Sequence, residues 1–258
     1  MISVIVATKK RPSLQRLLDS LRQQTLAYNE SWELLTRDDG INEYDARNRA
    51  AKEARGEIIA FLDDDTWVDE DYLEKGLKHF RDEKIVIMDC NLEGNFFGHG
   101  NMVIDKAGWG IGATLWVRKK QFMEIGMFED TWHLDPPPRG WRGDTDLLWR
   151  MLDRYGEDSY LHADDMVVHH PLPGGSSWDP RVEYLFYMRH KERCIRMFVP
   201  VDPRLCQLIL AVEDDNRIKE QVMKQVEEFV RNGVITMKQV NYSVEELKKL
   251  VNKNVLAL

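Results

Sequence analysis

Short apolar runs alternate with amphipathic stretches along the first 90 residues of the chain. The apolar runs have the length and the β-branched content of buried strands, and they cover residues 2–6, 32–36, 58–62 and 84–89. The stretches between them carry apolar residues at helical spacing, and they cover residues 14–21, 43–55 and 69–80. This alternation predicts an α/β fold, in which a mostly parallel, doubly wound sheet has helices on both faces.

The rest of the chain is less regular. The pattern predicts a Gly-rich loop at 93–112, a strand at 113–117, a helix at 119–125, a Pro-rich loop at 132–143, a helix at 144–155, a strand at 165–169 and a long helix at 179–198. After residue 201 it changes to amphipathic helices at 205–230 and 243–251, with a short strand or turn at 234–240. We therefore expect one α/β domain at residues 1–200 and a C-terminal helical extension at residues 201–258.

Three consecutive carboxylates follow the third apolar run. Asp63, Asp64 and Asp65 come directly after five apolar residues. Adjacent acids cannot share a buried position without a counter-charge, so they must lie where the strand emerges at the carboxyl edge of the sheet. A divalent cation that carries a phosphorylated ligand would balance their charge. The alternative is a solvated acidic loop.

Composition narrows the class of protein. A formal net charge of −8 disfavours binding to nucleic acid, and 43% hydrophobic with 31% charged residues is typical of a globular protein. No apolar run approaches 18 residues, and the N-terminal strand lacks the features of a signal peptide. The three cysteines, Cys90, Cys194 and Cys206, lack the spacing of a zinc site and favour a reducing compartment. We therefore expect a cytoplasmic protein.

Five segments follow one another in a characteristic order: VIVATKKRP, RDDG, ARNRAAKEARGEIIAFLDDD, GDTDLLWRM and VVHH. Over about the first 200 residues, this order resembles the family 2 inverting glycosyltransferases of the GT-A fold. The resemblance implies a metal-dependent enzyme that uses Mn²⁺ or Mg²⁺. Such an enzyme moves a sugar from a nucleoside diphosphate-sugar, with UDP favoured, to the hydroxyl of a sugar, a glycolipid or another acceptor.

By this resemblance, the three acids and a late histidine form the metal site. Asp65 is the direct ligand, Asp63 contacts the metal or the ribose, and Asp64 is the least involved acid on the donor side. Adjacent residues on a strand face opposite sides, so only one of His169 and His170 is expected to reach the metal. We favour His169 and keep His170 as the alternative. A partly exposed histidine pair is the structural alternative to both.

The resemblance also assigns residues to the donor nucleotide. They are Ala7, Thr8, Arg11, Asp38, Asp39 and Arg47. In the family, an acid after the second strand binds the base, and the arginine contacts the base or the diphosphate. The structural alternatives are a plain turn with solvated acids and a solvated arginine on the helix.

Asp144 matches the catalytic base of the family pattern Glu-Asp-x-Asp-Leu-x-x-Arg, in which this chain has Gly143 in place of the glutamate. Trp141 is the candidate for stacking on an acceptor sugar, with Gly143 beside it on the acceptor side. Asp144 begins a predicted helix, so a plain N-cap is the alternative, and the helix dipole should keep its pKa low. Asp146 and Arg150 are four residues apart and should pair along the helix.

Two other functions fit parts of the pattern. A nucleotidyltransferase would carry a Gly-rich first loop, and residues 7–13 contain no glycine. A non-catalytic sugar-nucleotide-binding relative is consistent with Gly143. Arg189, Arg193 and Arg196 share a helix face, which is either solvated or in peripheral contact with lipid phosphate at the inner face of the membrane. The pattern does not indicate an oligomeric state.

Overall fold

The computed structural model describes residues 1–95, 101–104, 111–130, 133–135, 137–138, 142–170, 178–196 and 203–254. The chain separates into two compact units, Met1–Ser177 and Trp178–Leu258. The first unit contains the sheet, and the described part of the second unit is helical. The domain boundary expected between residues 200 and 201 lies outside the described residues.

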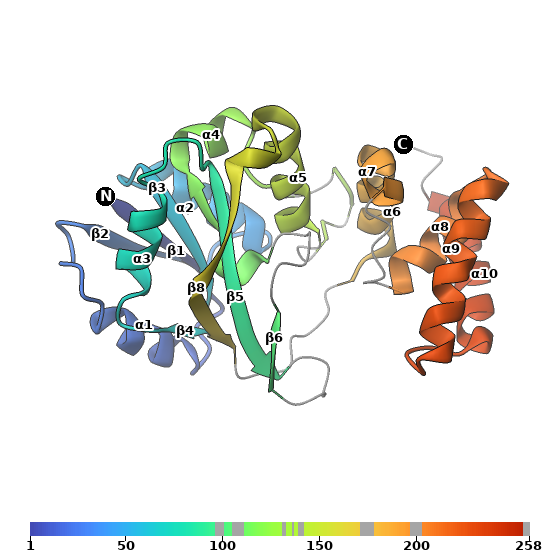
Figure 1. Cartoon of the computed structure of the whole chain (residues 1–258), viewed down its shortest axis with the longest axis horizontal. Coiled ribbons are helices and arrows are strands. Elements are labelled where there is room, and N and C mark those ends of the chain that lie inside the picture. Colours follow the sequence, from blue (N-terminus) through green and yellow to red (C-terminus); the bar gives the residue numbers. More distant parts are fainter. Residues whose placement is uncertain are drawn as a thin grey trace. The chain divides into compact units, whose positions relative to one another are not determined.

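The first unit is built on a sheet of eight described strands. They are β1 Ile2–Ala7, β2 Trp32–Arg37, β3 Ile58–Asp63, β4 Trp67–Val68, β5 Ile87–Asn95, β6 Asn101–Ile104, β7 Trp116–Arg118 and β8 Tyr160–His170. The strand order is β2-β1-β3-β7-β5-β8-β4, and β6 pairs with β5 outside this path (Figure 1). β1 runs parallel to β2 and β3, as β5 does to β8, whereas β7 is antiparallel to both of its neighbours. The predicted α/β fold is confirmed, with a mixed sheet.

Helices alternate with the strands along the chain of the first unit. Those described in the first unit are α1 Leu14–Arg22, α2 Glu43–Glu53, α3 Tyr72–His79, α4 Lys119–Glu124 and α5 Gly143–Tyr155. α2 packs against β1 and β2, whereas α1 contacts β4 and α3 contacts β8. Asn42 starts α2, because its side-chain oxygen accepts hydrogen bonds from the backbone N–H groups of Tyr44 and Asp45.

The core lies on both faces of the central strands. Every residue from Ile2 to Val6 and from Ile58 to Leu62 is buried, as the continuous apolar runs predicted. Each large apolar side chain in such a position contributes about 1.5–3 kcal/mol to folding. Phe61 packs edge-on against Phe128 with ring centroids 5.0 Å apart. The Arg47 guanidinium lies 5.6 Å from the Phe61 ring centroid. This arginine therefore packs against the apolar core near the end of β3.

The structure differs from the sequence pattern in the second half of the sheet. β5 continues to Asn95 and pairs with β6, so part of residues 93–112, expected as loop, is strand. β8 begins at Tyr160 rather than Asp165. The two-residue strand β4 was not expected, and it pairs with the end of β8. All of these pairings join segments far apart in the chain, which local periodicity does not report.

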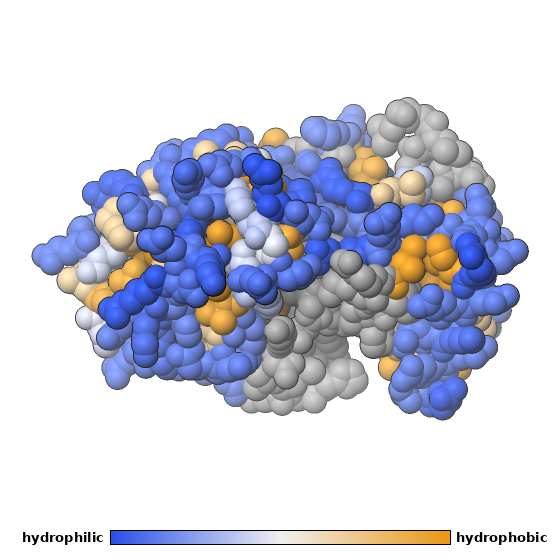
Figure 2. All heavy atoms as spheres, turned by 45° about the horizontal axis from the view of Figure 1, so that its top comes forward, coloured by the Kyte–Doolittle hydropathy of each residue, from blue (hydrophilic) through white to orange (hydrophobic). Residues whose placement is uncertain are grey.

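The second unit has helices α6 Pro180–Arg189, α7 Lys191–Arg196, α8 Pro203–Val212, α9 Asn216–Arg231 and α10 Met237–Asn254. The single helices expected at 179–198 and 205–230 are therefore interrupted, and α10 begins inside the stretch 234–240 expected as a strand or turn. Arg193 is buried, which disrupts the basic face expected of Arg189, Arg193 and Arg196. The surface in Figure 2 is mostly hydrophilic, with small hydrophobic patches. Among the described helices, none has the length and apolarity needed to cross a membrane.

Candidate active site

The carboxyl ends of β1, β2 and β3 meet at one edge of the sheet. In the parallel register, Ala7 at the end of β1 pairs with Arg37 on β2 and with Asp63 on β3. The residues that follow these three strands therefore lie close together. This register brings the turn after Ala7, the Asp38–Asp39 turn and the three consecutive acids to the same edge.

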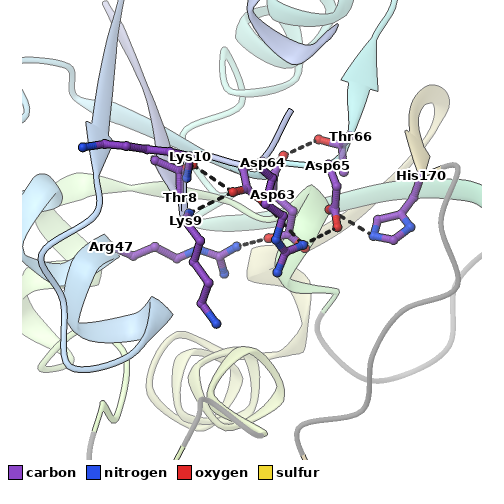
Figure 3. A network of polar contacts seen from close by, with 10 residues as sticks. Thr8, Lys9, Lys10, Arg47, Asp63, Asp64, Asp65, Thr66 and His170 are labelled. Carbon is purple, nitrogen blue, oxygen red and sulfur yellow. Dashed lines mark hydrogen bonds and ion pairs between the residues drawn. The ribbon is translucent and has the colours of Figure 1, made fainter. Parts of the chain in front are cut away.

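Asp64 fastens the first turn to the end of β3 (Figure 3). Its Oδ2 atom accepts hydrogen bonds from the Thr8 hydroxyl at 2.8 Å and from the Lys9 backbone N–H at 3.0 Å. The Thr8 backbone N–H donates to the Arg37 carbonyl at 2.8 Å, which ties the same turn to β2. Asp64 is buried, and hydrogen bonds to a charged group of this kind contribute about 1.5–3 kcal/mol each. Asp64 thus holds the turn in place.

Asp63, Asp65 and His170 form a cluster that can hold a metal ion. One ligand atom from each residue lies within 4.8 Å of the other two. Two carboxylates and an imidazole suit Mn²⁺, and also Mg²⁺, with water and phosphate oxygens completing the shell. His170 Nε2 lies 3.2 Å from Asp65 Oδ1, and this hydrogen bond lowers the pKa of Asp65. Asp65 is therefore ionised at neutral pH, as a metal ligand must be.

The two histidines at the end of β8 face opposite sides of the strand. His170 points toward Asp65 (Figure 3). His169 instead forms hydrogen bonds with Glu93 at 2.9 Å and Asp69 at 3.2 Å, and its ring stacks on Trp67 with centroids 5.2 Å apart. The structure therefore places His170, the alternative candidate, in the cluster, and places the favoured His169 outside it.

Two arginines pair with the carboxylates of the cluster. Arg11 Nη1 lies 2.7 Å from Asp65 Oδ2. Arg47 Nη2 lies 2.5 Å from Asp63 Oδ1, and the two side chains point toward each other in Figure 3. Arg47 is only 1% exposed, which excludes the solvated arginine considered from the sequence. Its Nε and Nη1 atoms have no hydrogen-bond partner within the described part of the chain. Because a buried donor without a partner is costly, Arg47 is a candidate contact for an anionic diphosphate.

Asp38 and Asp39 lie beside the same first turn. Lys10 forms a hydrogen-bonded ion pair with Asp38, and this contact lowers the pKa of the Asp38 carboxyl. Asp39 lies 3.9 Å from Arg37 and 3.8 Å from Arg49. Both acids are exposed at the sheet edge. They are therefore accessible at the place where the resemblance puts the nucleotide base.

Asp144 lies in the first turn of α5 and faces the 3₁₀ turn Gly112–Thr114. It accepts hydrogen bonds from the Gly112 N–H at 3.0 Å and the Thr145 N–H at 2.7 Å. A Cβ on Gly112 would come within 3.1 Å of both Asp144 Oδ2 and Arg47 Nη1, so these two groups converge on Gly112. Burial raises the pKa of Asp144, although these two hydrogen bonds and the charge of Arg47 act to lower it. The low pKa expected from the helix dipole is therefore wrong, because desolvation has the larger effect.

Further along α5, Asp146 and Arg150 form the predicted pair, with 2.7 Å between Asp146 Oδ2 and Arg150 Nε. Arg150 also donates to the backbone carbonyls of Ile125 at 2.8 Å and Met127 at 2.6 Å. Asp146 is fully buried. The pair therefore anchors α5 to the segment after α4, which supports the position of Asp144.

Gly143 starts α5 at a place where Tyr44 leaves no room for a side chain. A Cβ at position 143 would lie 2.4 Å from Tyr44 Cε2. The Tyr44 ring stacks on Phe128 with centroids 5.0 Å apart, and its hydroxyl accepts a hydrogen bond from the Asp144 N–H at 3.4 Å. The glutamate of the family pattern could not fit here unless Tyr44 moved. Trp141, the candidate for acceptor stacking, lies outside the described residues.

Glu43 belongs to this site although the sequence pattern did not single it out. It is the first residue of α2, and it is exposed. Desolvation by the surrounding protein raises the pKa of Glu43 to about 7, against the attraction of Arg47 and with the repulsion of Asp63 and Asp144. Contact with water moderates this shift, but the two nearby carboxylates act in the same direction. The spacing of four residues to Arg47 was the signal available in the sequence.

The central segment of the chain is similar to known proteins. Residues 43–134, which include α2, β3 and the three acids, match the family model described as glycosyl transferase family 2. A segment of 50 residues is 42% identical to the Bacillus subtilis (strain 168) protein named "Putative glycosyltransferase EpsH". That segment covers 19% of this chain and 14% of the curated relative.

Solved structures share the fold over almost the whole chain. The mannosyltransferase PcManGT from Pyrobaculum calidifontis, in complex with GDP-Man and Mn²⁺, has a TM-score of 0.58 at 13% identity, over 98% of this chain and 88% of that one. S. aureus TarS 1–349 in complex with UDP-GlcNAc has a TM-score of 0.55 at 13% identity, over 99% and 91%. GalNAc-T7 with UDP, GalNAc and Mn²⁺ has a TM-score of 0.55 at 12% identity, over 98% and 57%. A longer TarS structure is covered over 53% of its length. These likenesses show the fold.

Proposed function

Because residues 43–134 match glycosyl transferase family 2 and the fold is that of GT-A enzymes, we propose that the protein is a metal-dependent inverting glycosyltransferase. It would move a sugar from a nucleoside diphosphate-sugar to an acceptor hydroxyl. One observation carries the proposal: Asp63, Asp65, Arg47 and Asp144 converge at the carboxyl edge of the sheet. Arg47 connects the two parts of the proposed site, because it pairs with Asp63 of the donor-binding part and lies beside Gly112 with Asp144, the proposed proton acceptor.

The donor half has charges suited to a diphosphate. A divalent cation held by Asp63, Asp65 and His170 would stabilise negative charge on the departing diphosphate. Arg47 offers unpartnered N–H groups to phosphate oxygens, and Arg11 lies beside Asp65. Hydrogen bonds from arginine to phosphate are among the stronger ones in proteins, and they strengthen as charge develops on the leaving group.

Asp144 would accept the proton of the acceptor hydroxyl. As the acceptor oxygen bonds to the anomeric carbon, the bond from that carbon to the diphosphate breaks and the proton passes to Asp144. Attack from the face opposite the leaving group inverts the configuration at the anomeric carbon. Burial makes Asp144 a stronger base than an ordinary aspartate, and the Gly112 and Thr145 N–H groups orient its carboxylate.

The donor nucleotide is proposed from the sequence resemblance, which favours UDP. TarS is described in complex with UDP-GlcNAc, and PcManGT in complex with GDP-Man. Relatives of this fold therefore take either base. Asp38 and Asp39 are the residues we assign to base recognition, because they lie next to the first turn at the sheet edge.

The test is a screen of UDP- and GDP-sugars with the full chain, with Mn²⁺, with Mg²⁺ and with a chelator. We expect metal-dependent release of a nucleoside diphosphate. Release of pyrophosphate would instead identify a nucleotidyltransferase, and metal-dependent nucleotide binding without any product would identify a non-catalytic relative. Failure of every nucleotide to bind would contradict the proposal as a whole.

A further inference from the structure

The start of α5 lacks one of the two carboxylates of the family pattern. Where the family pattern has two adjacent acids, this chain has Gly143 and Asp144, and the Tyr44 ring occupies the space of a side chain at position 143. The residue before Tyr44 on α2 is Glu43. The Glu43 carboxylate therefore belongs to the neighbour of Tyr44, the residue that leaves no room for a carboxylate side chain at position 143.

The cap of α2 sets the position of Glu43. Asn42 accepts the hydrogen bonds that start the helix, and its side-chain amide donates to the Pro138 carbonyl at 3.1 Å, which ties the helix start to the segment before α5. Glu43 and Arg47 are one helical turn apart and share a face of α2. The charged groups around the Glu43 carboxyl come from four elements: Arg47 on α2, Lys9 after β1, Asp63 on β3 and Asp144 on α5.

The Glu43 carboxyl is not committed to a structural contact. Within the described residues, no hydrogen bond or ion pair holds it, and the side chain is exposed. Arg47 indicates that a ligand binds at this place, because it is 1% exposed and two of its nitrogens have no partner in the described part of the chain. Its Nη1 atom points to the space beside Gly112 and Asp144. Unsatisfied donors of Arg47 therefore lie beside Asp144, and the Glu43 carboxyl on the same face of α2 is an acceptor without a partner in the described part of the chain.

We propose that Glu43 and Asp144 together bind the acceptor, and that the acceptor is a neutral sugar or polyol with two neighbouring hydroxyl groups. Asp144 accepts the hydrogen bond of the reacting hydroxyl, and Glu43 accepts that of its neighbour. This inference rests on the proposed function. Two carboxylates at this point repel an acidic acceptor, so a uronic acid or a phosphorylated sugar is disfavoured.

The ionisation of Glu43 gives the inference a second readout. An ionised carboxylate accepts a stronger hydrogen bond from a hydroxyl than a protonated one does. The raised pKa means that the Glu43 carboxyl ionises at a higher pH than an ordinary glutamate does. The affinity for a neutral acceptor should therefore rise as the pH increases, and this rise should be smaller in Glu43→Gln, in which only Asp144 can titrate.

The experiment is calorimetry on the full chain loaded with UDP or GDP and Mn²⁺. The probes are neutral p-nitrophenyl hexosides (glucoside, galactoside and mannoside) and p-nitrophenyl glucuronide as the acidic counterpart. We expect at least one neutral hexoside to bind more tightly than the glucuronide. Glu43→Gln should weaken that binding about tenfold and leave nucleotide binding within about twofold. Glu57→Gln, which changes another exposed glutamate, should behave like the wild type.

The outcomes separate this inference from the proposed function. If the wild type binds no nucleotide, the proposed function fails. If nucleotide binds but no neutral hexoside does, or if Glu43→Gln binds the hexoside as tightly as the wild type, the inference on the acceptor is wrong. Loss of nucleotide binding in Glu43→Gln, with an unchanged circular dichroism spectrum, would place Glu43 on the donor side and also overturn it.

Discussion

The three consecutive acids at the sheet edge, Asp63, Asp64 and Asp65, make different kinds of contact. Asp64 is held by the Thr8 hydroxyl and the Lys9 N–H, so it shapes the first turn. Asp63 and Asp65 are instead paired with the side chains of Arg47 and Arg11, and lie near His170. A ligand can displace an arginine side chain more readily than a backbone amide. The two outer acids are therefore the ones able to exchange partners.

The adjacent histidines provide a matched pair for testing the metal site. His170→Ala should lower the affinity for Mn²⁺, measured in the presence of UDP by electron paramagnetic resonance, by about tenfold or more, because it removes a ligand beside Asp65. His169→Ala should change it by less than about threefold, a weaker effect than outer-shell substitutions usually have, because His169 lies on the opposite side of β8. Equal effects of the two substitutions, or a larger effect of His169→Ala, would contradict the assignment.

Asp144→Asn should remove the proposed proton acceptor while preserving the proposed donor site. We expect sugar transfer to fall by about 10²–10⁴-fold, because a general base contributes roughly that factor. The affinity for UDP with Mn²⁺ should stay within about threefold, a small change compared with removal of a metal ligand. The control is Asp158→Asn, an exposed aspartate beyond the end of α5, which should keep full activity. Near-wild-type turnover of Asp144→Asn would show that another group takes the proton.

Side-chain hydrogen bonds to backbone N–H groups set the ends of helices in both units. α2 begins with a side-chain cap at Asn42 and delivers Glu43, Tyr44 and Arg47 to the site. The break between α8 and α9 uses the same device, because Glu213 accepts hydrogen bonds from the N–H groups of the two residues that follow it. In both places, a local side-chain contact stops or starts a helix that apolar periodicity alone would continue.

Glu213 should be important for the stability of the second unit. Its buried carboxylate also binds the Tyr187 hydroxyl at 2.5 Å and Lys191 at 2.7 Å. Glu213→Ala leaves these partners and two N–H groups unsatisfied, so it should lower the free energy of unfolding by about 1–3 kcal/mol in chemical denaturation. Glu227→Ala, at an exposed position of α9, should have little effect. Equal stability of the two variants would contradict this role.

The ionisation of Glu213 should make the free energy of unfolding depend on pH in the acidic range. Its hydrogen bonds outweigh desolvation and lower its pKa from 4.5 to about 2 in the folded chain. The ionised form is therefore favoured by folding, and the contribution is complete above pH 4.5 and is lost as the pH falls from there toward about 2. The wild type should lose more stability over this range than Glu213→Gln does.

On the scale of the whole molecule, the chain consists of two compact units, and the described residues of the candidate site all lie in the first. The parallel register of β1, β2 and β3 brings its parts together from the first 65 residues, and α5 and β8 add Asp144 and His170. Ligand binding should therefore stabilise the first unit by mass action.

UDP with Mn²⁺ should raise the melting transition of the first unit in differential scanning calorimetry. At a ligand concentration about 100-fold above its Kd, the expected stabilisation is about 2.7 kcal/mol. UDP with a chelator should give a smaller shift, because the metal cluster then contributes nothing. If neither UDP nor GDP shifts the transition at millimolar concentration with Mn²⁺, the first unit does not bind these nucleotides.

The sequence by itself determined the central strands, the helices between them and the edge where the acids lie. These depend on local signals: continuous apolar runs, helical spacing and acids that cannot be buried together. Only the tertiary structure decided which histidine joins the cluster, because the pairing of β4 with β8 orients them. It also decided that Arg47 is buried, that desolvation raises the pKa of Asp144, and that Tyr44 fills the space beside Gly143. Burial and contact arise between segments distant in the chain, so no local pattern contains them.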